Sequence, residues 1–438
     1  MSATNRPRKS GMSDHREDGL MLQIVSRENM TKAYKRVVSN KGSSGIDGMQ
    51  VDELKSYLQE HWLEIKRVLL SGGYQPQSVR QVEIPKPKGG VRLLGIPTVV
   101  DRLIQQAIHQ VLEPIFDPTF SEYSYGFRVQ RNARQAVKRA KEYVQSGGSW
   151  IVNVDLSKFF DEVDHDRLLS KLRIKVKDRR VIHLIDRYLR VGVMRNGIEQ
   201  RCEKGTPQGS PLSPLLSNTV LDELDKELEK RMHQFVRYAD DFQIYVGSQQ
   251  AALRVMKSLE RFIENTLKLK VNKKKSTIER PWETNFLGYS FMGKKQVKLK
   301  VSKESMKRFK GKIKELFRKG KGRNVRRFIL GTLNPVIRGW MIYFSATDVK
   351  GFTKDLDQWI RRRLRKVIWQ QLKRNWTRLQ ALMRRGLSEQ RAVMSAFNQR
   401  GPWWNSGASH MNKAYSNSYF ELIGLLSLQH AHKKYYSV

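Results

Sequence analysis

The spacing of apolar residues predicts a chain that mixes helices with short strands. Apolar side chains recur every three or four positions, the period of a helix, over the segments 20–37, 51–70, 100–116, 165–192, 214–232 and 250–268. Shorter runs rich in β-branched and aromatic residues have strand character, at 82–97, 150–155, 235–246 and 285–291. The pattern is typical of an α/β or α+β protein, and 438 residues are enough for two or three domains.

Residues 235–246 are predicted to form a β-hairpin with two adjacent acids at its tip. Two strand-like arms flank the tight turn of Ala239, Asp240 and Asp241. Adjacent carboxylates repel each other unless a positive charge lies beside them, and hard oxygen ligands on a rigid turn suit Mg²⁺. The alternative is a plain polar turn, because Asp is a common turn former. Taken alone, the hairpin favours that alternative.

A third carboxylate changes this balance. Asp155 stands at the C-terminal end of the strand-like run that begins at Trp150, and ligands collect at strand ends in α/β sheets. If this strand and the hairpin are neighbours, Asp155, Asp240 and Asp241 converge on one point. Such a group is what two-metal phosphoryl transfer requires, because one ion activates the attacking oxygen and the other neutralises charge on the leaving group.

The charge balance indicates a polyanionic partner. The chain holds 83 Lys and Arg against 42 Asp and Glu, a formal net charge of +41. Nucleic acid is the usual partner for such a surplus, because binding releases condensed counterions. A membrane is the less favoured partner, since no apolar run approaches the roughly 18 residues of a spanning helix and no signal-peptide pattern opens the chain. Cys202 is the only cysteine, which excludes disulfides and a Cys-rich zinc site and suits a reducing compartment.

Two blocks near the C-terminus carry much of the positive charge. Residues 294–330 hold 16 Lys and Arg and 2 acids, and residues 359–385 hold 10 Lys and Arg and no acid. In the second block Ile360, Leu364, Val367 and Ile368 keep helical spacing, which predicts basic residues on the opposite face. Charge runs are usually solvated faces, but two uncompensated faces in succession favour nucleic-acid binding.

Two further segments hold candidate ligand-binding residues. Lys86 and Arg92 lie on opposite arms near the Gly-Gly tip of the strand-like segment 82–97, where they are either solvated charges or a clamp for a triphosphate. Gln208 lies on a loop that leads into the helix beginning near Pro214, where it either bonds to backbone or contacts a nucleotide.

Taken as an ordered series, these motifs resemble the reverse transcriptases encoded by bacterial group II introns, which also act as splicing maturases. The likeness covers nearly the whole chain from about Leu20, and the compact basic C-terminal part is most similar to class C introns. The motifs that carry it are Ile84-Pro85-Lys86-Pro87 with Arg92, Ser124-Tyr125-Gly126-Phe127-Arg128, Asp155 with Phe159-Phe160, Thr206-Pro207-Gln208-Gly209, Tyr238-Ala239-Asp240-Asp241 and Phe286-Leu287-Gly288-Tyr289.

The resemblance implies a right-hand polymerase with fingers, a ferredoxin-like βαββαβ palm and a helical thumb that carries the maturase function. Asp155, Asp240 and Asp241 would be the catalytic residues and would bind two Mg²⁺. Lys86 and Arg92 would hold the dNTP, Phe160 would stack under its sugar and exclude a 2′-hydroxyl, and Gln208 would lie near nucleotide and template. The primer grip would be Phe286, Leu287, Gly288 and Tyr289.

The same resemblance sets the expected domains and partners. Residues 1–19 would be a disordered arm, 20–79 an N-terminal extension, 80–292 fingers and palm, 293–400 the thumb and maturase domain, and 401–438 a short DNA- or RNA-binding tail. Expected partners are group II intron RNA, an RNA template with DNA primer, target DNA and dNTPs, with no membrane partner, in a bacterial cytoplasm near the nucleoid. Arg361, Arg362 and Arg363 are the candidate RNA-binding residues. The tail has no cysteine and little length, so a DNA endonuclease domain is not expected, and priming would use an existing DNA end.

Two alternatives differ from a group II intron polymerase. The first is a splicing cofactor that binds RNA with a decayed polymerase domain; the intact Asp155, Asp240 and Asp241 weigh against it. The second is a domesticated reverse transcriptase in DNA repair or phage defence, which flanking intron RNA in the genome would distinguish.

Overall fold

The computed structural model describes residues 19–85, 89–195, 198–200, 204–205, 209–293, 296–320 and 322–436. The chain forms two compact units. Unit 1 comprises residues 1–136 and 150–278, and unit 2 comprises residues 137–149 and 279–438. Each unit has an apolar core of its own, so each can be described as a separate folded body.

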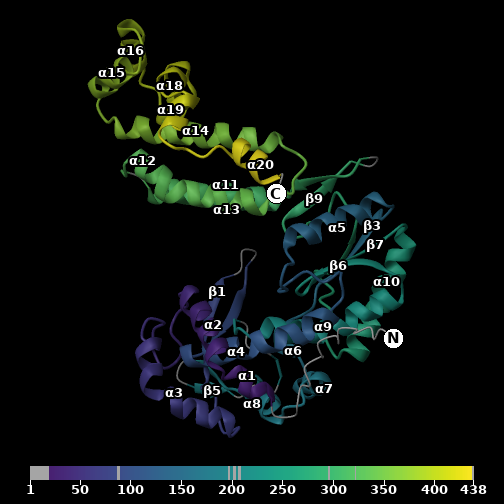
Figure 1. The fold of residues 1–438 in the computed structure, drawn as a ribbon. Coiled ribbons are helices and arrows are strands. Elements are labelled where there is room, and N and C mark those ends of the chain that lie inside the picture. Colours follow the sequence, from purple (N-terminus) through teal and green to yellow (C-terminus); the bar gives the residue numbers. More distant parts are fainter. Residues whose placement is uncertain are drawn as a thin grey trace, which may run out of the picture. The chain divides into compact units, whose positions relative to one another are not determined.

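Unit 1 combines two sheets with a set of helices (Figure 1). Its strands are β1 (Val79–Pro85), β2 (Val91–Ile96), β3 (Trp150–Val154), β4 (Val193–Arg195), β5 (Ile198–Gln200), β6 (Gln234–Tyr238), β7 (Asp241–Val246) and β8 (Thr277–Glu279), the last of which ends at the unit boundary. Its helices are α1 (Gly19–Ile24), α2 (Arg27–Ser39), α3 (Leu54–Leu70), α4 (Val99–Phe116), α6 (Phe159–Glu162), α7 (His165–Lys175), α8 (Arg179–Arg190), α9 (Ser213–Lys230) and α10 (Gln249–Arg261), and α5 (Ala133–Gln145) begins in this unit.

The first sheet has the strand order β6-β7-β3-β8. The pairs β6 with β7 and β7 with β3 are antiparallel. In chain order, β3 is followed by α6 to α9, with β4 and β5 of the other sheet inserted between α8 and α9, and then by the β6–β7 hairpin, α10 and β8. Within this sheet the succession is βαββαβ. This order and succession are those of a ferredoxin-like fold, as expected, and α10 packs on the sheet. The predicted hairpin at 235–246 is confirmed.

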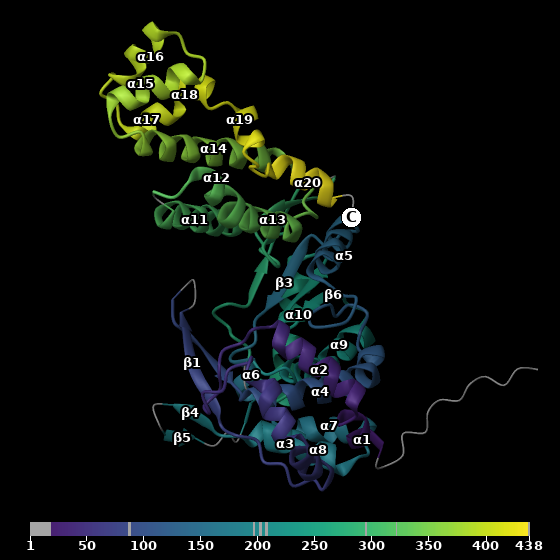
Figure 2. The same ribbon diagram turned by 60° about the vertical axis from the view of Figure 1, so that its left-hand side comes forward.

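Two predicted helical segments are divided in the structure: 165–192 forms α7 and α8, and 20–37 is divided as well. The segment 20–37 forms two helices, α1 and α2, because Ser26 turns to an extended backbone conformation and caps α2 by accepting a hydrogen bond from the amide of Asn29. The Asn29 side chain then donates to the carbonyl of Ala107 on α4 at 3.0 Å. The break therefore lets both short helices pack on α4, as Figure 2 shows.

The second sheet of unit 1 has the order β2-β1-β4-β5. The predicted strand-like segment 82–97 forms its β1–β2 hairpin, in which Ile84 pairs with Arg92. The buried carboxylate of Asp101, on α4, accepts hydrogen bonds from the hydroxyls of Tyr74 (2.9 Å) and Tyr188 (3.1 Å). These bonds connect α4 with α8 and with the chain that leads into β1.

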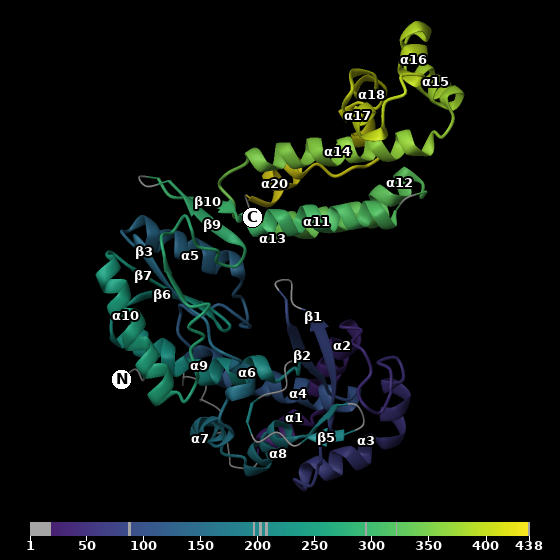
Figure 3. The same cartoon turned by 180° about the vertical axis from the view of Figure 1, so that it is seen from behind.

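Unit 2 is mainly helical, with one hairpin of β9 (Tyr289–Met292) and β10 (Lys298–Val301). Its helices are α11 (Lys303–Lys319), α12 (Val325–Phe328), α13 (Asn334–Tyr343), α14 (Gly351–Gln371), α15 (Asn375–Arg384), α16 (Glu389–Ala396), α17 (Pro402–Gly407), α18 (Ser409–Ala414), α19 (Asn417–Leu422) and α20 (Leu428–Tyr436). Figure 3 shows α14 running along α20, with α15 to α18 gathered around its C-terminal half. The carboxylate of Asp357 on α14 fixes α20 by accepting from the amide of Leu428 at 2.8 Å.

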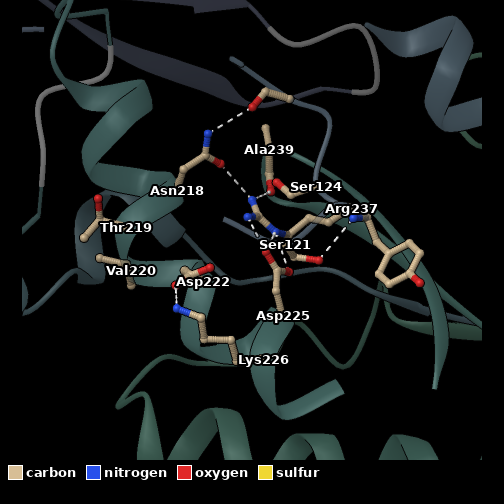
Figure 4. Close-up of polar contacts among 12 residues, drawn as sticks. Ser121, Ser124, Asn218, Thr219, Val220, Asp222, Asp225, Lys226, Arg237 and Ala239 are labelled. Carbon is tan, nitrogen blue, oxygen red and sulfur yellow. Dashed lines mark hydrogen bonds and ion pairs between the residues drawn. The ribbon is translucent and has the colours of Figure 1, made fainter. Parts of the chain in front are cut away.

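A buried polar network holds the turn of the β6–β7 hairpin (Figure 4). The Arg237 side chain has no exposed surface and forms a bidentate ion pair with Asp225 of α9, with its shortest N–O distance at 2.6 Å. The same guanidinium donates to the side-chain oxygen of Asn218 and to the carbonyl of Ala239, both at 2.9 Å. Ala239 has a positive φ of 57°, an unfavourable conformation for a residue with a Cβ, so the hydrogen bond stabilises a strained turn.

Gly126 fits against the same turn because it has no side chain. A Cβ at this position would overlap the backbone nitrogen of Ala239. The carbonyl of Gly126 accepts a hydrogen bond from the Asn218 amide at 3.0 Å, and the amide of the preceding Tyr125 donates to the carbonyl of Arg237 at 2.9 Å. The hairpin turn is therefore held from two sides by segments far apart in the sequence.

Replacing Asp225 by Asn should lower the free energy of unfolding of unit 1 by about 3–5 kcal/mol, because the Arg237 charge stays buried without its counter-charge. Urea unfolding of the full chain measures the loss, and hydrogen exchange of the β6 and β7 amides assigns it to this sheet.

Two controls make the Asp225 test specific. Lys32→Ala removes an exposed i,i+4 pair with Glu28, whose side chains are 66% and 81% exposed, and should cost less than about 1 kcal/mol. The double variant Asp225→Leu with Arg237→Met removes both charges and should recover much of the stability. If the Asp225→Asn variant is as stable as the parent chain, Asp225 does not have the assigned role of neutralising the buried Arg237 charge.

Candidate active site

Strand register brings the three predicted aspartates to one end of the ferredoxin-like sheet. Strands β3 and β7 pair from Trp150 with Val246 to Val154 with Phe242, so the next residues on the two strands are Asp155 and Asp241. Asp241 also pairs with Tyr238 across the hairpin, and Asp240 occupies the turn between them. The expectation that the hairpin and the Asp155 strand are neighbours is confirmed.

The backbone of Asp155 is fixed by the segment before β8. Its amide donates to the hydroxyl of Ser276 at 3.0 Å, and its carbonyl accepts from the amide of Asn272 at 2.8 Å. The side chain of Lys275, in the same segment, lies 3.5 Å from the Asp155 carboxylate. An exposed ammonium group thus already lies beside one of the three acids.

The pKa values of the hairpin acids show that the three carboxylates interact. Burial, together with the negative charges of Asp240 and Asp155, raises the pKa of Asp241 to about 6. The pKa of Asp240 is also raised, chiefly by burial and secondarily by Asp155. The positive charge of Arg92 on β2 opposes both shifts, which means that this predicted site residue lies close enough to act on the acidic pair.

The carboxylates of Asp155, Asp240 and Asp241 are suitable ligands for a divalent cation. Carboxylate oxygens are the ligands that hard cations prefer, and the raised pKa of Asp241 reflects negative charge that a bound cation would neutralise. Among the residues that the structure describes, no three His, Cys, Asp or Glu side chains are already grouped closely enough to hold a metal. The strand register places the three aspartates beside one another at one end of the sheet. Their role as metal ligands stays a prediction.

Phe160 lies on the short helix α6, which begins four residues after Asp155. The chain reverses there through Lys158, which has a φ of 48°, and Phe160 packs edge-on against Phe159 with ring centroids 5.2 Å apart. Gly205 lies under this helix, where a Cβ would come within 2.7 Å of the Phe160 carbonyl. Buried His165 contacts the Gly205 carbonyl at 2.6 Å, so the loop that leads toward Gln208 is attached to the segment bearing Phe160.

Two predicted dNTP-binding residues, Lys86 and Gln208, lie outside the described residues. The residues beside them are described. Gly209, with a φ of 110°, lies where a Cβ would be 3.2 Å from the carbonyl of Gly95 on β2. Gly209 itself therefore lies against the strand that carries Arg92.

The predicted primer grip, Phe286 to Tyr289, belongs to unit 2. Only Tyr289 lies in a strand, so the predicted strand at 285–291 is shorter than expected. The other three residues form a tight turn, because Leu287 and Gly288 both have positive φ and Phe286 and Tyr289 exchange backbone hydrogen bonds. The Tyr343 hydroxyl donates to the carbonyl of Leu287 at 2.9 Å, and the Tyr289 hydroxyl donates to the carbonyl of Tyr343.

Ile360, Leu364 and Ile368 of the predicted apolar face of α14 are buried. Arg361, Arg362 and Arg363 lie on the same helix and are all half-buried. Arg362 stacks on Trp403 at 4.3 Å from the ring centroid, and Arg363 stacks on Trp359 at 4.5 Å. Planar guanidinium groups pack well on aromatic rings, which draws these side chains against the protein. Their RNA-binding role stays a prediction.

Several residues that shape the site were not foreseen from the sequence: Gly126, Asn218, Asp225, Arg237 and Lys275. Two features of the sequence indicate buried charges. Arg237 interrupts an apolar strand, and Asp225 follows Leu221 by four residues on the apolar face of α9, so both charges occupied core positions. A charge at a core position indicates a buried partner.

Two family models match the chain. The model for reverse transcriptase (RNA-dependent DNA polymerase) matches residues 84–291, and the model for the group II intron maturase-specific domain matches residues 306–386. Polymerases with the first domain use divalent metal ions, and both domains act with nucleic-acid partners. Within the described residues, no helix has the length and apolar character to cross a bilayer.

Individual relatives agree with these matches. Protein YkfC of Escherichia coli (strain K12) is 30% identical over 64% of this chain and 83% of its own length. The group II intron-encoded protein LtrA of Lactococcus lactis subsp. cremoris is 31% identical over 63% of this chain, which covers only 57% of LtrA. Among solved structures, a partial Cas6-RT-Cas1–Cas2 complex matches at 26% identity with a TM-score of 0.36, over 57% of this chain and 43% of that one. The chain therefore belongs to the group II intron-encoded reverse transcriptases, RNA-dependent DNA polymerases that combine a right-hand polymerase fold with a maturase-specific domain.

Proposed function

We propose that the chain extends a DNA primer on an RNA template at the site formed by Asp155, Asp240 and Asp241, with two Mg²⁺ as cofactors. The observation that carries this proposal is the β3–β7 register, which supports a role for Asp155 beside Asp241 at the hairpin end. The action of Arg92 on both hairpin acids supports a common site for the phosphates of a dNTP and the metal-binding carboxylates.

Each residue has a distinct task in the proposed reaction. Two bound Mg²⁺ would activate the primer 3′-oxygen and neutralise charge on the departing pyrophosphate. Arg92 and Lys86 hold the triphosphate, and Gln208 contacts nucleotide and template. Phe160 supports the sugar and excludes a 2′-hydroxyl, so that dNTPs are preferred. The Phe286–Tyr289 turn supports the primer end, and Tyr343 stiffens that turn.

The second proposed activity is that of a maturase. Unit 2 would bind the parent group II intron RNA and assist its splicing, and the polymerase would copy that RNA from a nick in target DNA during mobility. In this proposal residues 1–19 are an N-terminal arm and 20–79 are the N-terminal extension. Residues 80–292 are the fingers and palm, 293–400 the thumb and maturase domain, and 401–438 a DNA- or RNA-binding tail. The protein would act in the bacterial cytoplasm near the nucleoid, where target DNA lies.

Replacing Asp240 by Ala should reduce dNTP incorporation at least roughly a thousandfold, because a metal-binding carboxylate is lost, while leaving RNA binding intact. The measurement is primer extension on an RNA template with Mg²⁺, beside equilibrium RNA binding.

Asp166→Ala is the matched control, since this acid on α7 has an 88% exposed side chain and should leave synthesis unchanged. Parental extension by the Asp240 variant contradicts the assigned site. No synthesis by the parent chain either, together with tight salt-sensitive RNA binding, points to a splicing cofactor that only binds RNA.

The Mg²⁺ requirement should depend on pH. Without metal the pKa of Asp241 is about 6, so below that pH an ion must displace a proton, and above it the carboxylate is already charged. The half-saturating Mg²⁺ concentration for primer extension should be constant above about pH 7 and rise as pH falls through 6, approaching tenfold per unit. Mg²⁺ titrations at fixed ionic strength from about pH 5.5 to 8 measure this. A constant half-saturation over that range is the contrary result.

Replacing Arg361, Arg362 and Arg363 together by Gln should weaken RNA binding and make it less sensitive to salt. Each lost phosphate contact lowers the slope of log K against log salt by about 0.7–0.9, so the slope should fall by roughly two if most of the three bind phosphate. The matched control is the triple Lys variant, which keeps the charge and should keep the slope. If the Gln variant retains the parental slope, this part of α14 does not contact RNA.

A further inference from the structure

We propose that Trp403 and Trp404 form a stacking site for an unpaired stretch of nucleic acid, which we name the indole platform. The proposal deepens the nucleic-acid role proposed for unit 2 and does not depend on the polymerase site. The maturase-specific match ends at residue 386, so these two residues lie beyond it.

The platform residues are unusually exposed for tryptophans. Trp403 is 41% exposed and Trp404 is 50% exposed, although they are consecutive and belong to a unit with a well-developed apolar core. Large aromatic side chains that are exposed at a protein surface and do not pack in its core commonly mark a binding site.

The backbone that presents both rings is held rigidly by buried polar groups. Asn405, the next residue on α17, has no exposed surface; its amide donates to the carbonyl of Arg400 at 2.8 Å, and its oxygen accepts from Asn398 at 2.8 Å. The hydroxyl of Ser406, also fully buried, donates to the carbonyl of Trp403 at 2.7 Å. The backbone that carries the indoles is thus preorganised, which lowers the entropy lost when a ligand binds.

Arginines surround the two rings. The Arg362 guanidinium lies 4.3 Å from the Trp403 centroid and also donates to the Trp403 carbonyl, and Arg400 lies 5.5 Å from the Trp404 centroid. Gly407 leaves room for Arg362, because a Cβ there would be 3.0 Å from the guanidinium carbon. Aromatic rings interleaved with guanidinium groups are the combination that binds bases by stacking and phosphates by charge.

The charge of the chain segment that leads to the platform selects the class of ligand. Residues 373–404 contain seven Lys and Arg and one acid, Glu389, so a polyanion is complementary and a basic or neutral protein surface is not. An unpaired strand suits the indoles better than a duplex, because the base faces in a duplex are covered by their neighbours. The platform is therefore assigned to single-stranded DNA or RNA.

The test uses the full chain with its template and primer already bound. The protein is saturated with an RNA template and DNA primer, and a fluorescent unpaired strand of about twelve nucleotides, long enough for one single-strand site, is then added and followed by anisotropy. Trp403→Ala and Trp404→Ala should each weaken this second binding event roughly five- to hundredfold, the range for losing one base stack. Phe at either position keeps an aromatic face, so the Phe variants should retain most of the affinity and the parental salt dependence.

The controls separate stacking from other effects. Trp376→Ala removes another exposed indole, 64% exposed on α15, and should leave binding unchanged. DNA and RNA strands are tested in parallel, and a loss confined to one identifies the natural ligand. Parental affinity in both platform variants, an equal loss on a blunt duplex, or an equal loss in Trp376→Ala would overturn the proposal. Primer extension on the saturating template should stay at the parental rate, so failure of the polymerase proposal is visible separately.

Discussion

The buried ion pair between Arg237 and Asp225 is the constraint on which the active-site turn depends. A fully buried pair contributes little net stability, because desolvating both charges offsets most of their attraction. Its effect is positional: one guanidinium binds Asp225 on α9, Asn218 seven residues earlier on the same face of that helix, and the carbonyl of Ala239. Ala239 has a strained positive φ, so the direction of the following acids, Asp240 and Asp241, depends on a side chain that never reaches solvent.

Local patterns predicted the parts of the fold that depend on local sequence. The β6–β7 hairpin, the strand ending at Asp155 and most helices followed from periodicity, since each pattern reports which face of one element is buried. The break between α1 and α2 was missed because apolar spacing continues across Ser26, whose cap decides the outcome. Gly126 could not be understood from its neighbours, because the atom that excludes a Cβ belongs to Ala239, more than a hundred positions away.

The charge count from the sequence also overestimates how many arginines are exposed and able to contact RNA. Counting charges treats each arginine as solvated, yet Arg365 is only 6% exposed and donates to the carbonyl of Tyr415. Arg378 lies 4.7 Å from the centroid of Trp369, and Arg385 lies 4.4 Å from that of Tyr419. Guanidinium groups are weakly hydrated and planar, so they replace apolar contacts in the packing of unit 2.

On α14, the arginines that pack on aromatic rings are also the residues predicted to bind RNA. Arg362 is held by Trp403 and in turn fixes one side of that indole, so the group predicted to contact RNA and the ring proposed to stack on a base form one packed assembly. Removing either alters the order of the other, and effects at these positions should not add. A basic helix whose arginines were all solvated would attract nucleic acid through charge alone. Here the same charges also set the position of aromatic surface, and in the proposed platform this arrangement would favour a strand whose bases are unpaired over one whose bases are covered.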